Sequence, residues 1–156
     1  MRTYLMFNNL GKVIRDAGFD LTYIAGVCGV SKSSMGRYCN GDSIPNMEVA
    51  LKICDATGYG FYDIWGKPYE AIRKKFYVPE KIGYKIQSRY HNNLEYFRNM
   101  KGFSVNFLAF RCGISYRSMN RYLRRETIPN VADAIVLATA LETTVYDLFE
   151  KDYLNV

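Results

Sequence analysis

The fold is decided by the stretch Gly29-Val30-Ser31-Lys32-Ser33-Ser34-Met35-Gly36-Arg37-Tyr38-Cys39-Asn40-Gly41. A glycine opens this stretch and an Asn-Gly pair closes it, and both tolerate the left-handed backbone conformation that commonly ends a helix. Ser31 follows the first glycine, where a serine oxygen can accept the free N–H groups of a helix's first turn. The stretch therefore predicts one short helix, from about residue 32 to Tyr38 or Cys39, between two turns.

The sequence around this stretch recurs without a gap 84 residues later. The paired segments are Asn8-Asn9-Leu10 with Asn92-Asn93-Leu94, Gly18-Phe19 with Gly102-Phe103, Cys28-Gly29-Val30-Ser31 with Cys112-Gly113-Ile114-Ser115, Ser34-Met35 with Ser118-Met119, Arg37-Tyr38 with Arg121-Tyr122, Ile44-Pro45-Asn46 with Ile128-Pro129-Asn130, and Tyr62-Asp63-Ile64-Trp65 with Tyr146-Asp147-Leu148-Phe149. Two copies, each long enough to bury a core, indicate a duplicated domain rather than a solenoid. We expect an N-terminal domain over 1–66, a connector over 67–90 and a C-terminal domain over 91–156.

Each copy is predicted to hold five short helices and no strand. In the first copy we expect them over about residues 8–17, 21–28, 32–39, 46–56 and 62–65. Asp20 and Ser104 are well placed to cap the second helix of each copy, as Ser31 and Ser115 are for the third. The predicted fold class is all-α: two tandem five-helix domains joined by a basic, partly helical connector.

The second and third helices of each copy are joined by a short turn that contains glycine, which is the arrangement of a helix-turn-helix unit. Ala25 and Ala109 stand four positions before the turn glycine, where two helices that cross closely need a small residue. Val30 and Ile114 are expected to fill the turn. The inner face of the third helix is expected to contribute Met35, Tyr38, Met119 and Tyr122 to the core. Its outer face remains free, and the second helix of such a unit can enter the DNA major groove.

The stretch from Gly29 to Gly41 resembles the most recognisable part of the lambda-repressor-like, Cro/Xre-type helix-turn-helix family. The copy from Gly113 to Arg125 is a more divergent instance, and the two Ile-Pro-Asn segments resemble that family's entry to its fourth helix. The resemblance covers residues 7–66 and 91–150. It implies an all-α fold and binding to double-stranded DNA.

Similarity to that family also implies which side chains would meet DNA. The base-contacting residues would be the first exposed ones of the third helix and one a turn later: Lys32, Ser33 and Arg37 in the first copy, and Tyr116, Arg117 and Arg121, with Asn120 beside them, in the second. Arginine can donate two hydrogen bonds to guanine, so Arg117 and Arg121 are the main specificity candidates. Arg124 and Arg125 follow the helix where the family commonly contacts phosphate, and would add affinity rather than sequence preference.

Three departures from the family pattern set the two copies apart or weaken both. Family members often have a phosphate-binding glutamine at the first residue of the second helix, whereas these positions are Leu21 and Val105. The first copy also has Gly36 within its third helix, which costs roughly 1 kcal/mol relative to alanine. Residues 1–66 hold six Lys/Arg and six Asp/Glu, so this copy has no net charge. We expect the second copy to be the better reader of DNA.

The net charge of +6 favours an anionic partner, and most of it lies in the connector. Residues 67–90 hold seven Lys/Arg and two Asp/Glu, and residues 91–156 hold eight and seven. Pro68 and Pro79 are each suited to open a helix in the connector. The basic residues that either follow a DNA backbone or form a solvated spacer are Arg73, Lys74, Lys75, Lys81, Lys85 and Arg89.

The composition excludes several other classes of protein. Cys28, Cys39, Cys54 and Cys112 lack CxxC spacing, and His91 is the only histidine, so buried free thiols are expected and no metal site. No apolar run is long enough to span a membrane and no secretory signal is recognisable, which favours a cytoplasmic protein. No metal-ligand cluster, phosphate-binding glycine loop or nucleophile with a base is found, so we expect no catalytic residues, no cofactor and no enzyme.

These observations together favour a sequence-specific DNA-binding transcriptional regulator, in the first place a repressor, of bacterial or phage type. Two linked readers can cover two half-sites about 34 Å apart on one face of the duplex. A homodimer, formed through the first copy or the Tyr153-Leu154 region, is compatible with the sequence. The alternative is a phage or mobile-element protein that uses the scaffold to bind a protein, for instance to inhibit a host defence enzyme. Salt dependence of binding separates the two.

Overall fold

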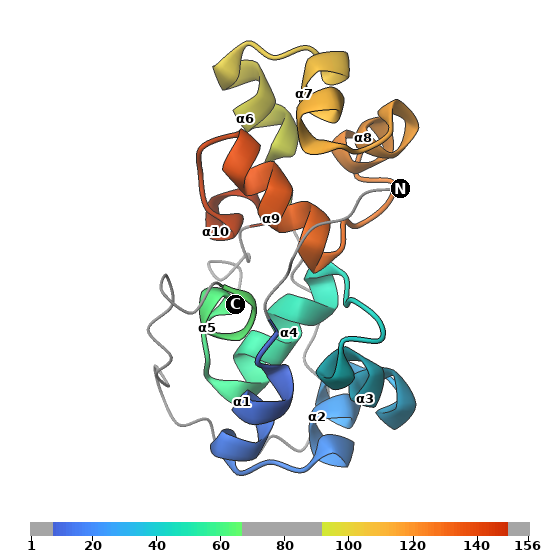
Figure 1. Cartoon of the computed structure of the whole chain (residues 1–156), viewed down its shortest axis with the longest axis vertical. Helices are drawn as coiled ribbons and strands as arrows, with labels where there is room; N and C mark the ends of the chain where they lie inside the picture. Colours follow the sequence, from blue (N-terminus) through green and yellow to red (C-terminus); the bar gives the residue numbers. More distant parts are fainter. Residues whose placement is uncertain (1–7, 67–91, 150–156) are drawn as a thin grey trace. The chain divides into compact units, whose positions relative to one another are not determined.

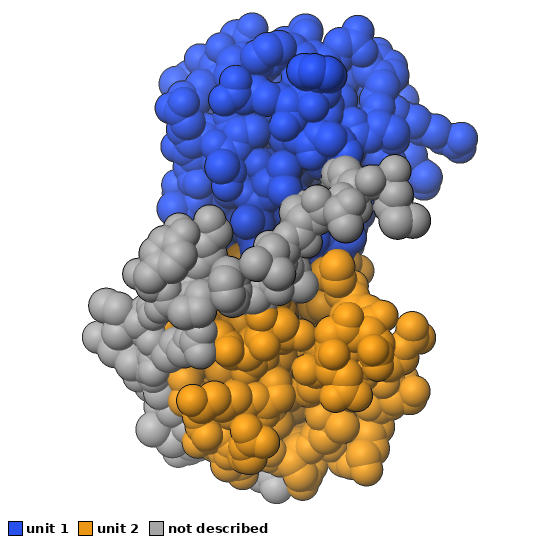
Figure 2. Space-filling view, viewed as in Figure 1, with its two compact units in different colours: residues 1–4, 89–156 blue, residues 5–88 orange. Residues whose placement is uncertain are grey.

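The computed structural model describes residues 8–66 and 92–149, which contain ten α-helices and no strand (Figure 1). The all-α fold class is therefore confirmed. The chain divides into two compact units, drawn in orange and blue in Figure 2. We call them the N-terminal unit, described over 8–66, and the C-terminal unit, described over 92–149. The connector with its expected helices, His91 and the Tyr153-Leu154 region lie outside the described residues.

The five helices of the N-terminal unit begin and end close to the predicted positions. They are α1 (Leu10–Ala17), α2 (Leu21–Cys28), α3 (Lys32–Asn40), α4 (Met47–Thr57) and α5 (Phe61–Trp65). The predicted caps are present: the Asp20 carboxylate accepts a hydrogen bond from the Tyr23 N–H at 2.7 Å, and the Ser31 hydroxyl accepts one from the Ser34 N–H at 3.0 Å. Gly41 ends α3 with a φ of 78°, the left-handed conformation that favours glycine.

The C-terminal unit holds a second set of five helices, each beginning 84 residues after its counterpart. They are α6 (Leu94–Lys101), α7 (Val105–Cys112), α8 (Tyr116–Leu123), α9 (Val131–Ala140) and α10 (Val145–Leu148). Ser104 and Ser115 accept hydrogen bonds from the Phe107 and Ser118 N–H groups at 3.0 and 3.1 Å, as the cap prediction requires. The same local chemistry thus starts the corresponding helices of both units.

The residues expected to pack beneath the turn are mostly buried. Ala25 and Ala109 are buried residues of α2 and α7, the helices that contact α3 and α8, and Met35 and Met119 have no exposed surface. Ile114 is buried, while Val30 is only half-buried. The core prediction was wrong for Tyr38 and Tyr122, which are half-buried. A phenol needs a polar partner, and the Tyr122 hydroxyl donates to an Asp133 carboxylate oxygen at 2.6 Å.

In each unit, one asparagine side chain ties the start of the first helix to the end of the third. In the C-terminal unit the Asn92 side chain donates to the Tyr122 carbonyl at 2.8 Å and accepts from the Leu94 N–H at 2.7 Å. In the N-terminal unit, the Asn8 side chain likewise donates to the Tyr38 carbonyl at 2.8 Å and accepts from the Leu10 N–H at 3.0 Å. We call this arrangement the asparagine clamp. It adds a side-chain hydrogen bond to a carbonyl in the last turn of α3 or α8, which also accepts from the Gly41 or Arg125 N–H at 3.3 or 3.1 Å.

The asparagine that follows each clamp residue secures the last helix of the unit. The Asn93 N–H donates to the Leu148 carbonyl at 2.8 Å, and its side chain donates to the Asp147 carbonyl at 2.9 Å. The Asn9 N–H likewise donates to the Ile64 carbonyl at 2.8 Å. The recurring Asn-Asn-Leu segment therefore joins three helices at one point, a role that the repeat alone did not reveal.

We predict that Asn92→Ala lowers the free energy of unfolding by about 2 kcal/mol, because it removes the side chain that accepts from the buried Leu94 N–H and donates to the Tyr122 carbonyl. Urea denaturation of the intact chain followed by circular dichroism measures this change. Asn106→Ala is the matched control, since Asn106 is an exposed residue of α7 and its loss should change stability little. Equal stabilities of the Asn92 variant and the wild type would contradict a stabilising clamp.

Candidate nucleic-acid interface

The outward faces of α3 and α8 carry the residues that the sequence predicts to contact DNA. In α8, Tyr116, Arg117 and Arg121 are exposed, and Asn120 is half-buried. Arg117 and Arg121 are four residues apart, so they lie on the same face of the helix. Met119, on the opposite face, is completely buried. The helix therefore has an apolar side in the core and a basic, aromatic side in the solvent.

The N-terminal unit offers a smaller version of this surface. Lys32, Ser33 and Arg37 of α3 are all exposed, with Met35 buried beneath them. Residues 8–66 contain five Lys/Arg and six Asp/Glu, a net charge of −1, whereas residues 92–149 contain seven and five, a net charge of +2. The described part of the C-terminal unit is thus the more favourable of the two toward an anion.

The position of the missing glutamine is occupied by an apolar contact in the N-terminal unit. Leu21 is half-buried, and a Cβ placed on Gly36 would lie 3.7 Å from its Cδ2 atom. That is an ordinary van der Waals distance, so packing does not require glycine at position 36. Leu21 therefore faces α3, where it cannot replace the hydrogen bond to phosphate that a glutamine would supply.

A glutamate that the sequence analysis did not single out lies among the basic residues at the end of α8. This residue is Glu126. Its Oε2 atom lies 3.9 Å from Arg121 Nε, and its Oε1 atom lies 4.0 Å from Arg124 Nη1. All three side chains are about half exposed or more. Exposed ion pairs of this kind contribute little to stability. Their consequence is electrostatic, because Glu126 offsets positive charge at the expected interface.

Arg125, predicted to contact phosphate, has a partner within its own unit. Its Nη2 atom donates to the Asn92 carbonyl at 2.8 Å, which attaches it to the asparagine clamp. Its backbone φ is 62°, and the corresponding residue of the N-terminal unit is Gly41. A side chain in this left-handed conformation is strained relative to glycine. The C-terminal unit accepts that strain and gains a guanidinium group beside the end of α8.

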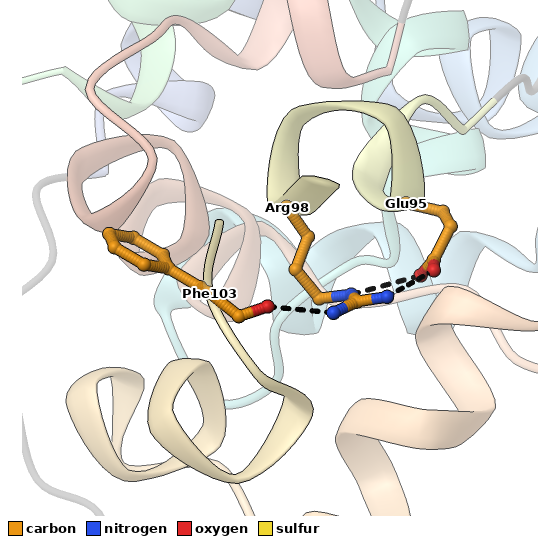
Figure 3. Close-up of polar contacts among 3 residues, drawn as sticks. All are labelled: Glu95, Arg98 and Phe103. Atoms are coloured by element: carbon orange, nitrogen blue, oxygen red, sulfur yellow. Dashed lines mark hydrogen bonds and ion pairs between the residues drawn. The ribbon is translucent and has the colours of Figure 1, made fainter. Parts of the chain in front are cut away.

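Another arginine of the C-terminal unit, Arg98, makes internal polar contacts. Figure 3 shows the Arg98 guanidinium between the Glu95 carboxylate and the Phe103 carbonyl, with distances of 3.1 Å to Glu95 Oε2 and 2.7 Å to Phe103. Hydrogen bonding to Arg98 lowers the pKa of Glu95 below its usual range and raises that of Arg98. This contact joins α6 to the turn that leads into α7.

The four cysteines differ in how deeply they are buried. Cys28, Cys54 and Cys112 are buried free thiols as predicted, while Cys39 is only half-buried, which corrects the prediction for that residue. Burial raises the pKa of Cys28 to about 12. Within residues 8–66 and 92–149 no group of three or more His, Cys, Asp or Glu is arranged to hold a metal ion. None of the helices in these ranges is long and apolar enough to cross a membrane.

The comparisons with known proteins agree with this geometry for the N-terminal unit. Residues 12–64 match a helix-turn-helix family, a stretch that contains α2, the turn and α3. In both its helices and this match, residues 12–64 are similar to a helix-turn-helix domain.

A relative from Pyrococcus abyssi (strain GE5 / Orsay) is 34% identical in an alignment of 70 residues that covers 42% of this chain. It is named, provisionally, an HTH-type transcriptional regulatory protein. The chain spans only 21% of the length of that relative. No solved structure matches the chain.

We predict that iodoacetamide at pH 8 alkylates Cys39 before the three buried cysteines, because the thiolate is the reactive form and burial keeps Cys28 protonated. Mass spectrometry of timed samples gives the order. Unfolding in urea should abolish the difference, and Cys39→Ser should remove the early product. Native labelling of Cys28 as fast as Cys39 would contradict the burial argument.

The same burial makes stability depend on pH. The unfolded thiol ionises near pH 9 and the folded Cys28 thiol near pH 12, so Cys28 lowers the free energy of unfolding as the pH rises above 9.

Proposed function

We propose that the protein is a sequence-specific regulator of transcription that binds double-stranded DNA through two tandem helix-turn-helix domains, 1–66 and 91–156, joined by the connector 67–90. The observation that supports this best is the face of α8 that carries Tyr116, Arg117 and Arg121 in solvent above the buried Met119. The helix-turn-helix match over residues 12–64 supports the same function for the N-terminal unit. We call α3 and α8 the reading helices.

The polar residues on α8 and just after it have distinct parts in this proposal. Arg117 and Arg121 donate paired hydrogen bonds to guanine in the major groove, a contact worth about 1 to 3 kcal/mol of discrimination. Tyr116 and Asn120 contact neighbouring base edges. Arg124 neutralises phosphate, which fixes the position of the domain without selecting sequence. Arg125 places one part of its guanidinium on Asn92 and the rest toward the backbone of the duplex.

The two units contribute unequally. The N-terminal unit presents only Lys32, Ser33 and Arg37 and has a net charge of −1 over its described residues. The C-terminal unit therefore supplies most of the affinity and specificity, and the N-terminal unit extends the recognised site to a second half-site about 34 Å away. The basic residues Arg73, Lys74, Lys75, Lys81, Lys85 and Arg89 add phosphate contacts between them. The setting is the cytoplasm of a bacterium or of a phage-infected cell, and the regulator is a repressor.

Two observations favour a second function. The described part of the N-terminal unit has no excess of positive charge, and Leu21 occupies the place of a phosphate-binding side chain. Both fit a domain that binds a protein instead, such as a host defence enzyme inhibited by a phage or mobile-element product. When a protein contacts several DNA phosphates, counterions are released from the duplex and the affinity falls steeply with salt. Binding to a protein partner shows no such steep fall.

We predict that Arg117→Ala and Arg121→Ala each weaken binding to the selected duplex by about tenfold and relax preference at one base pair. The site comes from a random-sequence selection with the intact chain, and affinities come from fluorescence anisotropy at several salt concentrations. Arg37→Ala is the matched control in the other reading helix and should have a smaller effect. Unchanged affinity and an unchanged motif in both α8 variants would show that this surface does not read DNA.

We predict that Glu126→Gln strengthens DNA binding about two- to fivefold at low salt, because it removes the carboxylate near Arg121 and Arg124. The gain should shrink as salt rises, since the charges are exposed. Glu142→Gln changes the net charge equally but lies beside Lys101, so it serves as the control. An equal gain in both variants would indicate a general charge effect and not a local one.

A further inference from the structure

The outer face of α7 exposes a row of aromatic rings that DNA reading does not use. Phe110 is 86% exposed and Phe107 is 42% exposed, and the two are one helical turn apart. The Phe103 ring lies 4.8 Å from the Phe107 ring, centroid to centroid, with an interplanar angle of 59°. We call Phe103, Phe107 and Phe110 the aromatic face. An aromatic ring that is almost fully in water within a regular helix requires an explanation.

The N-terminal unit shows that the fold itself does not require this face. The corresponding residues there are Phe19, Tyr23 and Gly26. Phe19 and Tyr23 keep the ring pair, at 5.1 Å, but Gly26 is exposed and carries no side chain. The α2 helix has the same length as α7 and the same left-handed glycine after it. Phe110 therefore serves something other than the folding of its unit.

Charged groups of both signs surround the aromatic face. The Arg111 guanidinium lies 5.9 Å from the centroid of the Phe107 ring. The Glu142 side chain is 73% exposed and pairs with Lys101 at 2.9 Å, and the charge of Arg111 also acts on it. A surface with an apolar centre and both signs at its edge can pair with a copy of itself, because a two-fold axis between the opposite charges sets the cation of each chain against the anion of the other.

We propose that the aromatic face is a dimer contact, in which α7 of one chain packs against α7 of a second copy across a two-fold axis. In an antiparallel pair Phe110 of each chain lies over Phe107 of the other, so the most exposed ring is covered. Aromatic residues and arginine are enriched at the centres of protein interfaces. The contact uses α7, which leaves the outward face of α8 in each chain accessible.

The area of the aromatic face sets the expected strength of the contact. With about 200 Å² for an aromatic side chain, exposures of 86% and 42% give roughly 250 Å² of apolar surface per chain. Two copies bury roughly 500 Å², about a third of a standard interface of about 1,600 Å². We therefore expect a weak dimer.

Sedimentation equilibrium of the full chain without DNA, from about 10 μM to about 1 mM, tests the proposal. The wild type should pass from monomer to dimer over this range. Phe110→Asp should weaken association at least tenfold, because it places a charge at the centre of the contact. Gly26→Asp places the same charge at the equivalent position of α2, where a Cβ meets nothing within 4 Å, and should leave association unchanged.

Three results would overturn the proposal: a monomer throughout the concentration range, equal association of wild type and Phe110→Asp, or an equal loss in both variants. Circular dichroism checks that each variant is folded, and Phe110→Ala provides a milder variant with the same expected direction. Because the measurement contains no DNA, its outcome is independent of the proposed function. A dimer that does not bind DNA and a DNA-binding monomer are both distinguishable results.

Discussion

The asparagine clamp is the contact on which the position of each reading helix depends. A helix of eight or nine residues is too short to be stable in water by its own hydrogen bonds, so it needs support from the rest of the unit. For α8, the Ser115 hydroxyl caps the first turn, Met119 anchors the middle and Asn92 holds the last turn through the Tyr122 carbonyl. The same three supports occur in α3. A helix fixed at both ends presents its outer face in one orientation, as sequence recognition demands.

The two units use one scaffold but differ in the chemistry they place on it. Where the N-terminal unit has Gly41 after the reading helix, the C-terminal unit has Arg125, which bonds to the clamp at the cost of a strained backbone. Where the first has Gly26, the second has the exposed Phe110. Because the two units satisfy the same folding constraints with the same helix positions, such differences point to function and not to stability.

Most of the fold could be predicted from the sequence through local chemistry, but the contacts between residues far apart in the sequence could not. Asp20, Ser31 and Ser115 could be assigned as caps because a cap depends on neighbours three residues away. The clamp joins residues thirty positions apart, so Asn8 and Asn92 stood out only as part of a repeat. Helical spacing placed Tyr38 and Tyr122 on the inner face but could not show that a phenol at its edge stays half-buried. Glu126 was missed because its ion pairs depend on how the chain turns after α8.

The central claim is that the chain meets DNA with the outward face of α8 while the clamp keeps that helix in place. Titration of the isotopically labelled chain with its selected duplex, followed by amide chemical shifts, tests this residue by residue. The account predicts that the largest changes occur from Tyr116 to Arg125, with smaller ones in α3 and little change in α9. Changes confined to other helices, with the amides of α8 unmoved at saturation, would contradict it.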